Sequence, residues 1–184
     1  MKTTLISHAS LLIQSGDTTL LTDPVFFNLL WEECNVPCPS IDLDLENLPT
    51  IDVLNISHRH QDHFDIRTLA HIAASDSILA PDAIVLAPRD EILLDVLKEL
   101  DFKNLTVVED FKTIEFKDFT LTPTPSLNEQ DYFPEHGLLV HDGVVTIWNQ
   151  VDTIVSPDII KYIHRLYGKP DMAHMRYLPL LEGN

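Results

Sequence analysis

The stretch from residue 51 to residue 74 constrains the fold more than any other. Residues 51–57 are rich in apolar and β-branched side chains, which predicts a buried strand. Residues 58–63, His-Arg-His-Gln-Asp-His, place three imidazoles and a carboxylate on one tight turn. Residues 64–74 carry apolar side chains at helical spacing. The strand would fix the position of the turn, and alternate side chains of the turn could converge on one point. This arrangement predicts a metal site.

The residue types in this turn indicate which ions fit. Neutral imidazole and carboxylate suit zinc, iron or manganese, and we expect two zinc ions, with iron or manganese as alternatives. His58 and His60 can bind one ion, and Asp62 and His63 a second. Two such ions can hold a water and lower its pKa, which generates a hydroxide nucleophile. The alternative is a solvated turn, but chance placement gives this pattern with a probability of only about 0.002.

The motif at 58–63 resembles the HxHxDH signature of the metallo-β-lactamase superfamily. Residues 7–14 and 20–26 resemble the opening of the branch that contains N-acyl-phosphatidylethanolamine phospholipase D and ascorbate-6-phosphate lactonase. Residues 143–153 resemble the family's later strand, which ends in a bridging aspartate, here Asp152. The resemblance covers residues 3 to about 153. It implies an α/β fold, a metallo-β-lactamase-like αββα sandwich, with Asp152 bridging the two ions.

Composition limits the partners of the chain. Twelve basic residues against 29 acidic ones give a net charge of −17 over 184 residues. This charge repels phosphate and argues against a nucleic acid or an anionic membrane as partner, so we expect a small-molecule substrate. No apolar run is long enough to span a membrane, and the N-terminus lacks the core of a signal peptide. Cys34 and Cys38 are too far apart for a CxxC motif and suit a reducing cytoplasm.

The remaining pattern alternates strands and helices within one domain, residues 1–184. The predicted strands are 3–7, 9–14, 18–22, 51–57, 83–87, 105–108, 113–116, 119–123, 138–140 and 144–148, the last two joined across His141-Asp142-Gly143. The predicted helices are 64–74, 89–100 and 157–167, the last with Ser156 as N-cap.

Two segments before the motif are candidates for the site. Asp23 could orient a ligand histidine through its other ring nitrogen, or it could simply begin a turn before Pro24; the resemblance favours the first role. His8 lies at a strand junction and is a site candidate. Residues 25–50 form a long connection with aromatic residues, including Trp31. This connection could wall a pocket for an apolar substrate, or be a surface flap with its own small core.

The sequence departs from the family pattern in two places. The third expected histidine is missing from residues 122–131, where Asn128 or Ser126 occupies its place. An amide is a weaker zinc ligand than imidazole. Glu129, Asp131 or His136 could replace the missing histidine as a ligand. His136 reaches the site only if residues 131–135 fold back.

The family's last histidine ligand comes from the second half of the fold, and that half is short or missing here. His164 falls in a predicted helix, and His174 is a weak candidate. The chain could be a fragment, a minimal variant, or a half that completes itself as a homodimer, since an exposed apolar sheet face normally finds a partner.

Together these features predict a metal-dependent hydrolase. A metal-bound hydroxide would attack an ester, lactone, amide or phosphodiester, and Asp62 would be the catalytic residue that orients it. A second reading is a di-iron redox enzyme of the same fold. A third is a degenerate domain that has lost full metal binding and acts through association.

Overall fold

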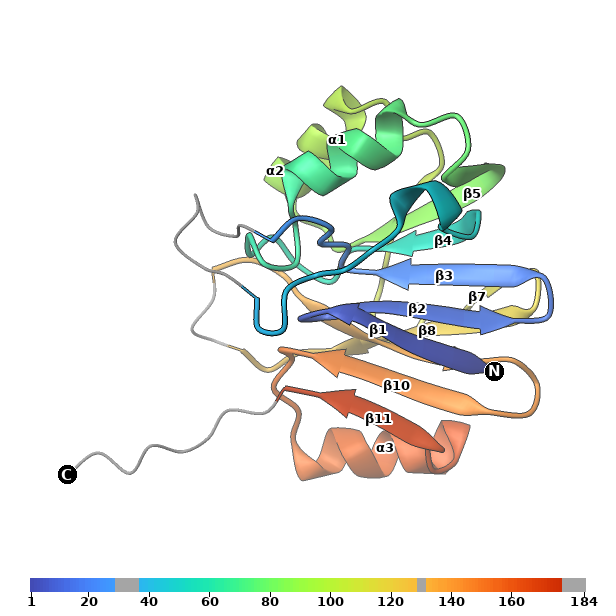
Figure 1. Ribbon diagram of the computed structural model, residues 1–184. Coiled ribbons are helices and arrows are strands. Elements are labelled where there is room, and N and C mark those ends of the chain that lie inside the picture. The colour runs from blue at the N-terminus through green and yellow to red at the C-terminus, as the bar shows by residue number, and fades with distance from the viewer. Residues whose placement is uncertain (29–36, 129–131, 177–184) are drawn as a thin grey trace.

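The computed structural model describes residues 1–28, 37–128 and 132–176 (Figure 1). Six strands form one sheet in the order β1-β2-β3-β4-β5-β6, and five form another in the order β11-β10-β9-β8-β7. The first sheet contains β1 (Lys2–Ser7), β2 (Ser10–Ser15), β3 (Thr18–Thr22), β4 (Ile51–Asn55), β5 (Leu79–Ala87) and β6 (Leu105–Val107). The second contains β7 (Ile114–Phe116), β8 (Phe119–Pro125), β9 (His136–His141), β10 (Thr146–Val151) and β11 (Met172–Met175). The helices are η1 (Leu45–Asn47), α1 (Ile66–Ala74), α2 (Glu91–Glu99) and α3 (Pro157–Tyr167).

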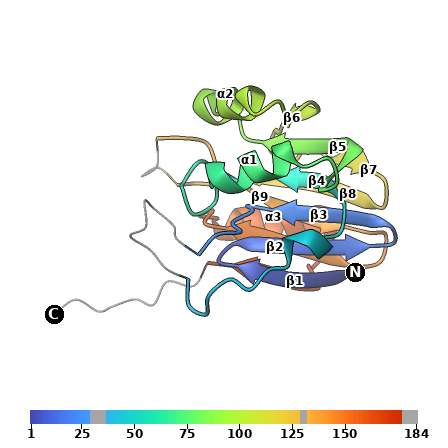
Figure 2. The same ribbon diagram turned by 45° about the horizontal axis from the view of Figure 1, so that its top comes forward.

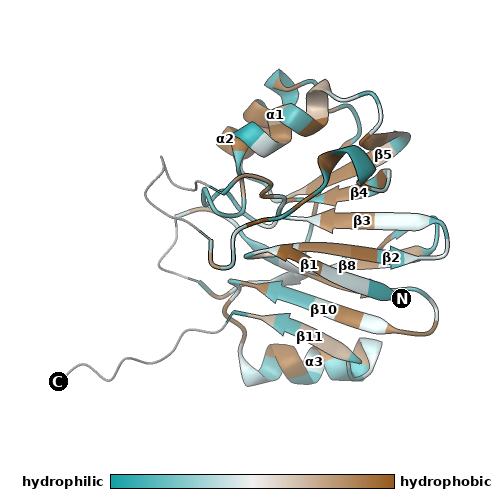
Figure 3. Ribbon diagram, viewed as in Figure 1, coloured by the Kyte–Doolittle hydropathy of each residue, from teal (hydrophilic) through white to brown (hydrophobic). Residues whose placement is uncertain are grey.

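Four layers follow from where the apolar side chains pack. One cluster lies between the first sheet and helices α1 and α2, and includes Leu54 and Leu69. A second lies between the two sheets, where Leu20 and Val53 meet Leu121 and other residues of the second sheet. A third joins the second sheet to α3 through Ile163 and its neighbours. Figure 3 shows the apolar residues on the strands of both sheets. The predicted αββα sandwich is confirmed, and the inner faces of the two sheets cover one another.

Capping side chains set the ends of the helices. The side chain of Asp65 accepts a hydrogen bond from the backbone N–H of Thr68, so α1 begins two residues later than predicted. Asp90 caps α2 in the same way and moves its start from the expected residue 89. Ser156 caps α3, whose predicted bounds are confirmed. A short polar side chain such as aspartate is more favourable at the N-cap than inside a helix. This preference explains why both helices begin later than predicted.

The strand β11 is the one element of the second sheet that the sequence pattern did not predict. It pairs parallel to β10, and α3 forms the crossover between them. Three of its four residues are exposed. A short edge strand buries little on either face, so it lacks the alternation by which strands are found. His174 on this edge strand and Arg176 directly after it line the cleft described below.

The long connection from residue 25 to residue 50 is described in part. Phe26 is buried, and Phe27 packs against the first core together with Leu43, Leu45 and other apolar residues of the loop. The described part therefore packs on the first core. Trp31, with Leu29 and Leu30, lies outside the described residues, and so does Cys34. Within the described ranges, no helix is long and apolar enough to cross a membrane.

The ends of several strands gather at one edge of the sandwich. β3 and β4 are parallel, so Asp23 and Ser57 follow their carboxyl ends side by side. β10 and β11 are also parallel, and their carboxyl ends bring Asp152 to the same edge. Figure 1 shows the arrowheads of β3, β10 and β11 pointing toward this edge, and Figure 2 shows the same edge from above. The turn between β1 and β2 adds His8.

Candidate metal centre

A buried carboxylate orients the imidazole of His63 at this edge. Its Nδ1 lies 3.0 Å from Asp23 Oδ2, and both side chains are essentially buried. Asp23 also accepts hydrogen bonds from the backbone N–H and the hydroxyl of Ser57, each at 2.7 Å. The ionised carboxylate makes Nδ1 the protonated nitrogen, which leaves the Nε2 lone pair of His63 for another partner. The structure therefore brings Asp23 to the second ring nitrogen of a motif histidine.

The Nε2 atom of His63 is buried and has no hydrogen-bond partner among the described residues. It lies 3.9 Å from Asp62 Oδ2 and 3.8 Å from Asp152 Oδ2. A buried nitrogen that faces two carboxylates without a hydrogen bond is costly unless a cation lies between them. The donor set of imidazole and carboxylate suits zinc, iron or manganese. The residues at this edge therefore fit a metal ion.

His58 and His60 lie on the other side of His63. The Nε2 of His58 is 2.8 Å from the Nδ1 of His60, and the His58 Nδ1 is 2.9 Å from the Ser57 hydroxyl. The ring of Phe133 stacks on His58 and meets the edge of His60, at 5.9 and 4.7 Å between ring centres. The two motif histidines therefore converge, and an aromatic ring covers them.

His8 brings a further imidazole to the motif. It lies on the two-residue turn between β1 and β2, and its Nε2 is 2.9 Å from Asp62 Oδ2. Its ring also meets the edge of the His63 ring at 5.3 Å. The structure thus places His8 within contact distance of two motif residues.

Among the residues that the structure describes, two groups of side chains have ligand atoms that all lie within 4.8 Å of one another. One is His8, Asp62 and His63; the other is His58, His63 and Asp152. The arrangement differs from the expected pairing, because His63 belongs to both groups and His8 joins the first. Asp152, the predicted bridging residue, belongs to the second group only, and its Oδ2 atom also lies 3.3 Å from Arg176 Nη1.

Electrostatics at this edge favour a cation. Burial lowers the pKa of His58 to about 3, helped by the neighbouring His63, so His58 is neutral and one of its two ring nitrogens carries a lone pair. Burial alone would also lower the pKa of His63, but the hydrogen bond and charge of Asp23, with Asp62 and Asp152, raise it. Burial acts to raise the pKa of Asp62, yet the hydrogen bond from His8 and the charge of His63 hold it below its usual range.

Three of the six described non-glycine residues with a positive φ lie at this edge. His8, Asp23 and Val151 adopt φ angles of 44°, 42° and 48°, in the left-handed region that favours glycine. For a β-branched residue such as Val151 this conformation is a true outlier. Each such residue costs on the order of 1–3 kcal/mol, and strain of this kind concentrates at functional sites. Two of these residues carry site side chains, and Val151 directly precedes Asp152.

The region expected to supply a third histidine is described in part. Asn128 is half-buried and its backbone N–H contacts the Ser126 hydroxyl, while Glu129 and Asp131 lie outside the described residues. His136 begins β9, is buried, and its Nε2 is 2.9 Å from Asn55 Oδ1. His136 belongs to neither of the two ligand groups. Of the other histidines, His164 is exposed on α3.

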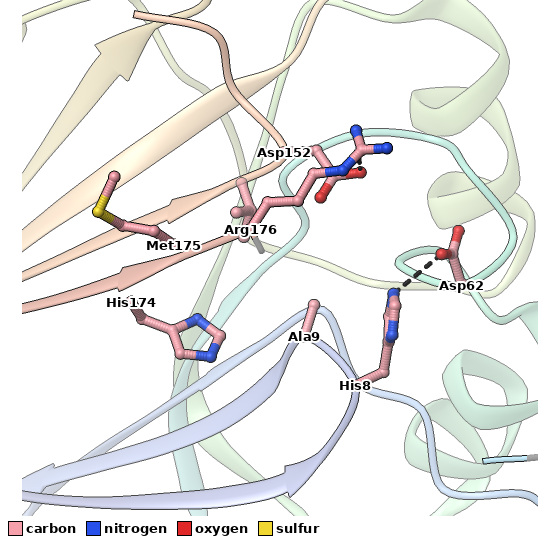
Figure 4. Close-up of a pocket in the computed structure, with 8 residues that line it drawn as sticks. His8, Ala9, Asp62, Asp152, His174, Met175 and Arg176 are labelled. Carbon is pink, nitrogen blue, oxygen red and sulfur yellow. Dashed lines mark hydrogen bonds and ion pairs between the residues drawn. The ribbon is translucent and has the colours of Figure 1, made fainter. Parts of the chain in front are cut away.

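His174 was only a weak candidate from the sequence, and Arg176 and the hydroxyl of Ser57 were not predicted as site groups. His174 and Arg176 line a cleft of about 400 Å³ together with His8, Asp62, Asp152 and three apolar neighbours (Figure 4). Both residues belong to or follow the unpredicted strand β11, so their position depended on a pairing that no local pattern signals. Ser57 could have been suspected, because it directly precedes the motif.

Comparison with known proteins identifies the family. A model described as the β-lactamase superfamily domain matches residues 2–155, and the chain belongs to this family. A Mycolicibacterium smegmatis protein described as a candidate Rieske 2Fe-2S iron-sulfur protein is 29% identical over 189 residues, covering 96% of this chain. A similarly described Mycobacterium tuberculosis protein is 36% identical over 94 residues, half of this chain. The chain spans 34% and 18% of the lengths of these relatives.

Solved structures show the same fold. CmlA, a diiron β-hydroxylase from Streptomyces venezuelae, superposes with a TM-score of 0.70 at 22% identity, over 92% of this chain and 33% of its own. An isothiocyanate hydrolase from Delia radicum gut bacteria superposes with a TM-score of 0.72 at 21% identity, over 94% of this chain and 70% of its own. At these identities the likeness establishes the fold alone.

Proposed function

We propose that the chain is the metal-binding catalytic domain of a metal-dependent hydrolase. The observation that carries the proposal is the buried, unpartnered Nε2 of His63, which faces the carboxylates of Asp62 and Asp152. We assign His58, His60, His63, Asp62 and Asp152 as ligands of two ions, with His8 as an additional ligand. Asp23 would hold His63 in the tautomer that a ligand needs. Ions bound there would lower the pKa of a water and polarise an ester, lactone or phosphodiester.

The chain's own groups supply the rest of the proposed reaction. Asp62 is ionised, so its carboxylate can accept a hydrogen bond from the attacking water and orient it. Phe133 covers His58 and His60 and keeps bulk water from that side. Exclusion of water strengthens every charge interaction inside the site.

The test is hydrolysis by protein loaded with zinc. We would assay bis(p-nitrophenyl) phosphate, p-nitrophenyl acetate and a simple lactone with wild-type protein, metal-stripped protein and Asp62→Asn. We expect turnover of at least one substrate that is lost on stripping, restored by zinc, and reduced by about 100-fold or more in Asp62→Asn. Asp95→Asn, on an exposed face of α2, is the matched control and should keep full activity. No metal-dependent turnover of any of the three would count against the proposal.

A di-iron redox enzyme is the second candidate. It is favoured by the Rieske description of the curated relatives and by the diiron β-hydroxylase among the similar structures. Imidazole and carboxylate together suit iron as well as zinc. Protein purified without added metal would then contain iron, be coloured, and consume dioxygen when a reductant is supplied. A colourless protein that contains only zinc would exclude this candidate.

A further inference from the structure

The cleft beside the candidate metal centre has one wall that the proposed chemistry does not use. His174 lies on β11 and Arg176 directly follows this strand, and both lie across the cleft from His8 and Asp62 (Figure 4). Backbone pairing anchors this wall, since the Arg176 N–H donates to the Val151 carbonyl at 3.2 Å. The two side chains therefore have a fixed place beside the centre without belonging to either ligand group.

The guanidinium of Arg176 has more hydrogen-bond donors than its contact with Asp152 uses. One of its terminal nitrogens contacts Asp152 Oδ2 at 3.3 Å, and the side chain is half exposed. A guanidinium carries five N–H donors in a planar fork that matches a carboxylate or a phosphate. A single long contact to one carboxylate oxygen does not exhaust these donors. A metal ion on Asp152 would compete for the same carboxylate and so release the fork toward the cleft.

His174 presents a hydrogen-bond acceptor. Its Nδ1 lies 3.1 Å from Asn149 Oδ1. The amide nitrogen of Asn149 donates to the Thr22 hydroxyl at 3.2 Å, which fixes the amide with its oxygen toward His174. An amide oxygen can only accept, so Nδ1 of His174 must carry the proton. The neutral ring then has its lone pair on Nε2, and Figure 4 shows the ring directed into the cleft.

We infer that β11 forms the substrate-recognition wall of the cleft and that the substrate is a small anion. Arg176 pairs with a carboxylate or phosphate-type oxyanion, and His174 accepts a hydrogen bond from a neighbouring hydroxyl or amine of the same molecule. This inference rests on the proposed function, which supplies both the reaction site and the bound ions. The net charge of −17 disfavours a polyanion, whereas a small anion held between Arg176 and bound dications meets a locally positive field.

The experiment measures anion binding to zinc-loaded protein whose metal content has been verified. Propanoate, lactate and methylphosphonate are titrated while amide chemical shifts are followed by NMR. Propanoate and methylphosphonate compare carboxylate with phosphate-type oxyanions, and lactate adds one hydroxyl to propanoate. The variants are Arg176→Gln, Arg176→Lys and His174→Phe, with Arg165→Gln on exposed α3 as the matched control.

We expect wild-type protein to bind at least one of the two oxyanion types with shifts centred on β11. Arg176→Gln should weaken that binding about tenfold or more, Arg176→Lys by less, and Arg165→Gln not at all. His174→Phe should leave the affinity for propanoate unchanged. It should abolish any preference for lactate over propanoate that wild-type protein shows. Binding that is absent from wild-type protein, or is unchanged in Arg176→Gln, would overturn the inference. Failure of the proposed function would appear separately, as wild-type protein that retains no zinc.

Discussion

The carboxylate of Asp23 offers the sharpest test of how the centre is held together. Its two oxygens accept three hydrogen bonds, two from Ser57 and one from His63. In Asp23→Asn the amide oxygen can keep one of these donors, but the new NH₂ group cannot accept from the others. The imidazole of His63 then gains by accepting from the amide, which moves its proton to Nε2. The nitrogen that should bind metal would be blocked.

We expect Asp23→Asn to lower both the metal affinity and the unfolding free energy. Loss of an orienting partner of a ligand histidine costs about 10- to 100-fold in metal affinity. Hydrogen bonds to a charged group contribute about 1.5–3 kcal/mol each. Because the Ser57 hydroxyl can rotate and the backbone N–H can keep its acceptor, we expect the unfolding free energy of metal-free Asp23→Asn to fall by about one such bond.

The assay is zinc affinity by competition with a chromophoric chelator, beside urea unfolding of the metal-free protein. Asp52→Asn is the matched control. Asp52 is also a buried carboxylate, and it lies at the other end of β4, where it accepts from the Thr19 N–H at 2.8 Å and pairs with Lys117 at 2.6 Å. It should lose stability and keep its zinc affinity. If folded Asp23→Asn binds zinc within about threefold of wild-type protein, well inside the expected loss, the orienting role of Asp23 is wrong.

Two further predictions concern stability. His8 has a φ of 44°, which only glycine adopts without cost, so His8→Gly should be about 1 kcal/mol more stable than His8→Ala. Both variants should lose zinc affinity equally. If urea unfolding shows His8→Ala to be the more stable variant, the strain argument is wrong. Burial lowers the pKa of His136 from its ordinary 6.5 to about 4, so the unfolded chain takes up its proton first as the pH falls. The unfolding free energy of metal-free protein should therefore decrease from pH 6.5 to 4, with a share of about 3 kcal/mol from His136. His136→Gln should flatten this slope in denaturant titrations, and an unchanged slope would refute the assignment.

Local sequence was sufficient to predict the layers and most elements. The run of apolar and β-branched residues in 51–57 and the Asp-Gly turn at 142–143 act through nearest neighbours, so the strands around them were found. The superfamily resemblance was confirmed by the family match over residues 2–155. The dense motif predicted a ligand cluster, and the structure does bring His58, Asp62 and His63 together.

What the sequence could not predict depends on contacts between distant residues. The grouping of His8 with Asp62 spans 54 positions and follows from a hairpin turn held at a positive φ. The pairing of β11 with β10 is an edge contact with little burial, so His174 and Arg176 could not be placed in the cleft beforehand. The observed starts of α1 and α2 differ from the predicted ones because the sequence alone does not distinguish an aspartate that caps a helix from one inside it.

The central claim is that this edge of the sandwich holds metal, and the most direct measurement is metal content per chain. Protein purified without added metal would be analysed by elemental mass spectrometry, beside Asp62→Ala and Asp152→Ala. We predict about two ions per wild-type chain, as a two-metal site requires, and a loss of at least one in each variant. Zinc would support the hydrolase, and iron the redox enzyme. A wild-type chain that holds almost no metal, or variants that retain as much as wild-type protein, would contradict the account.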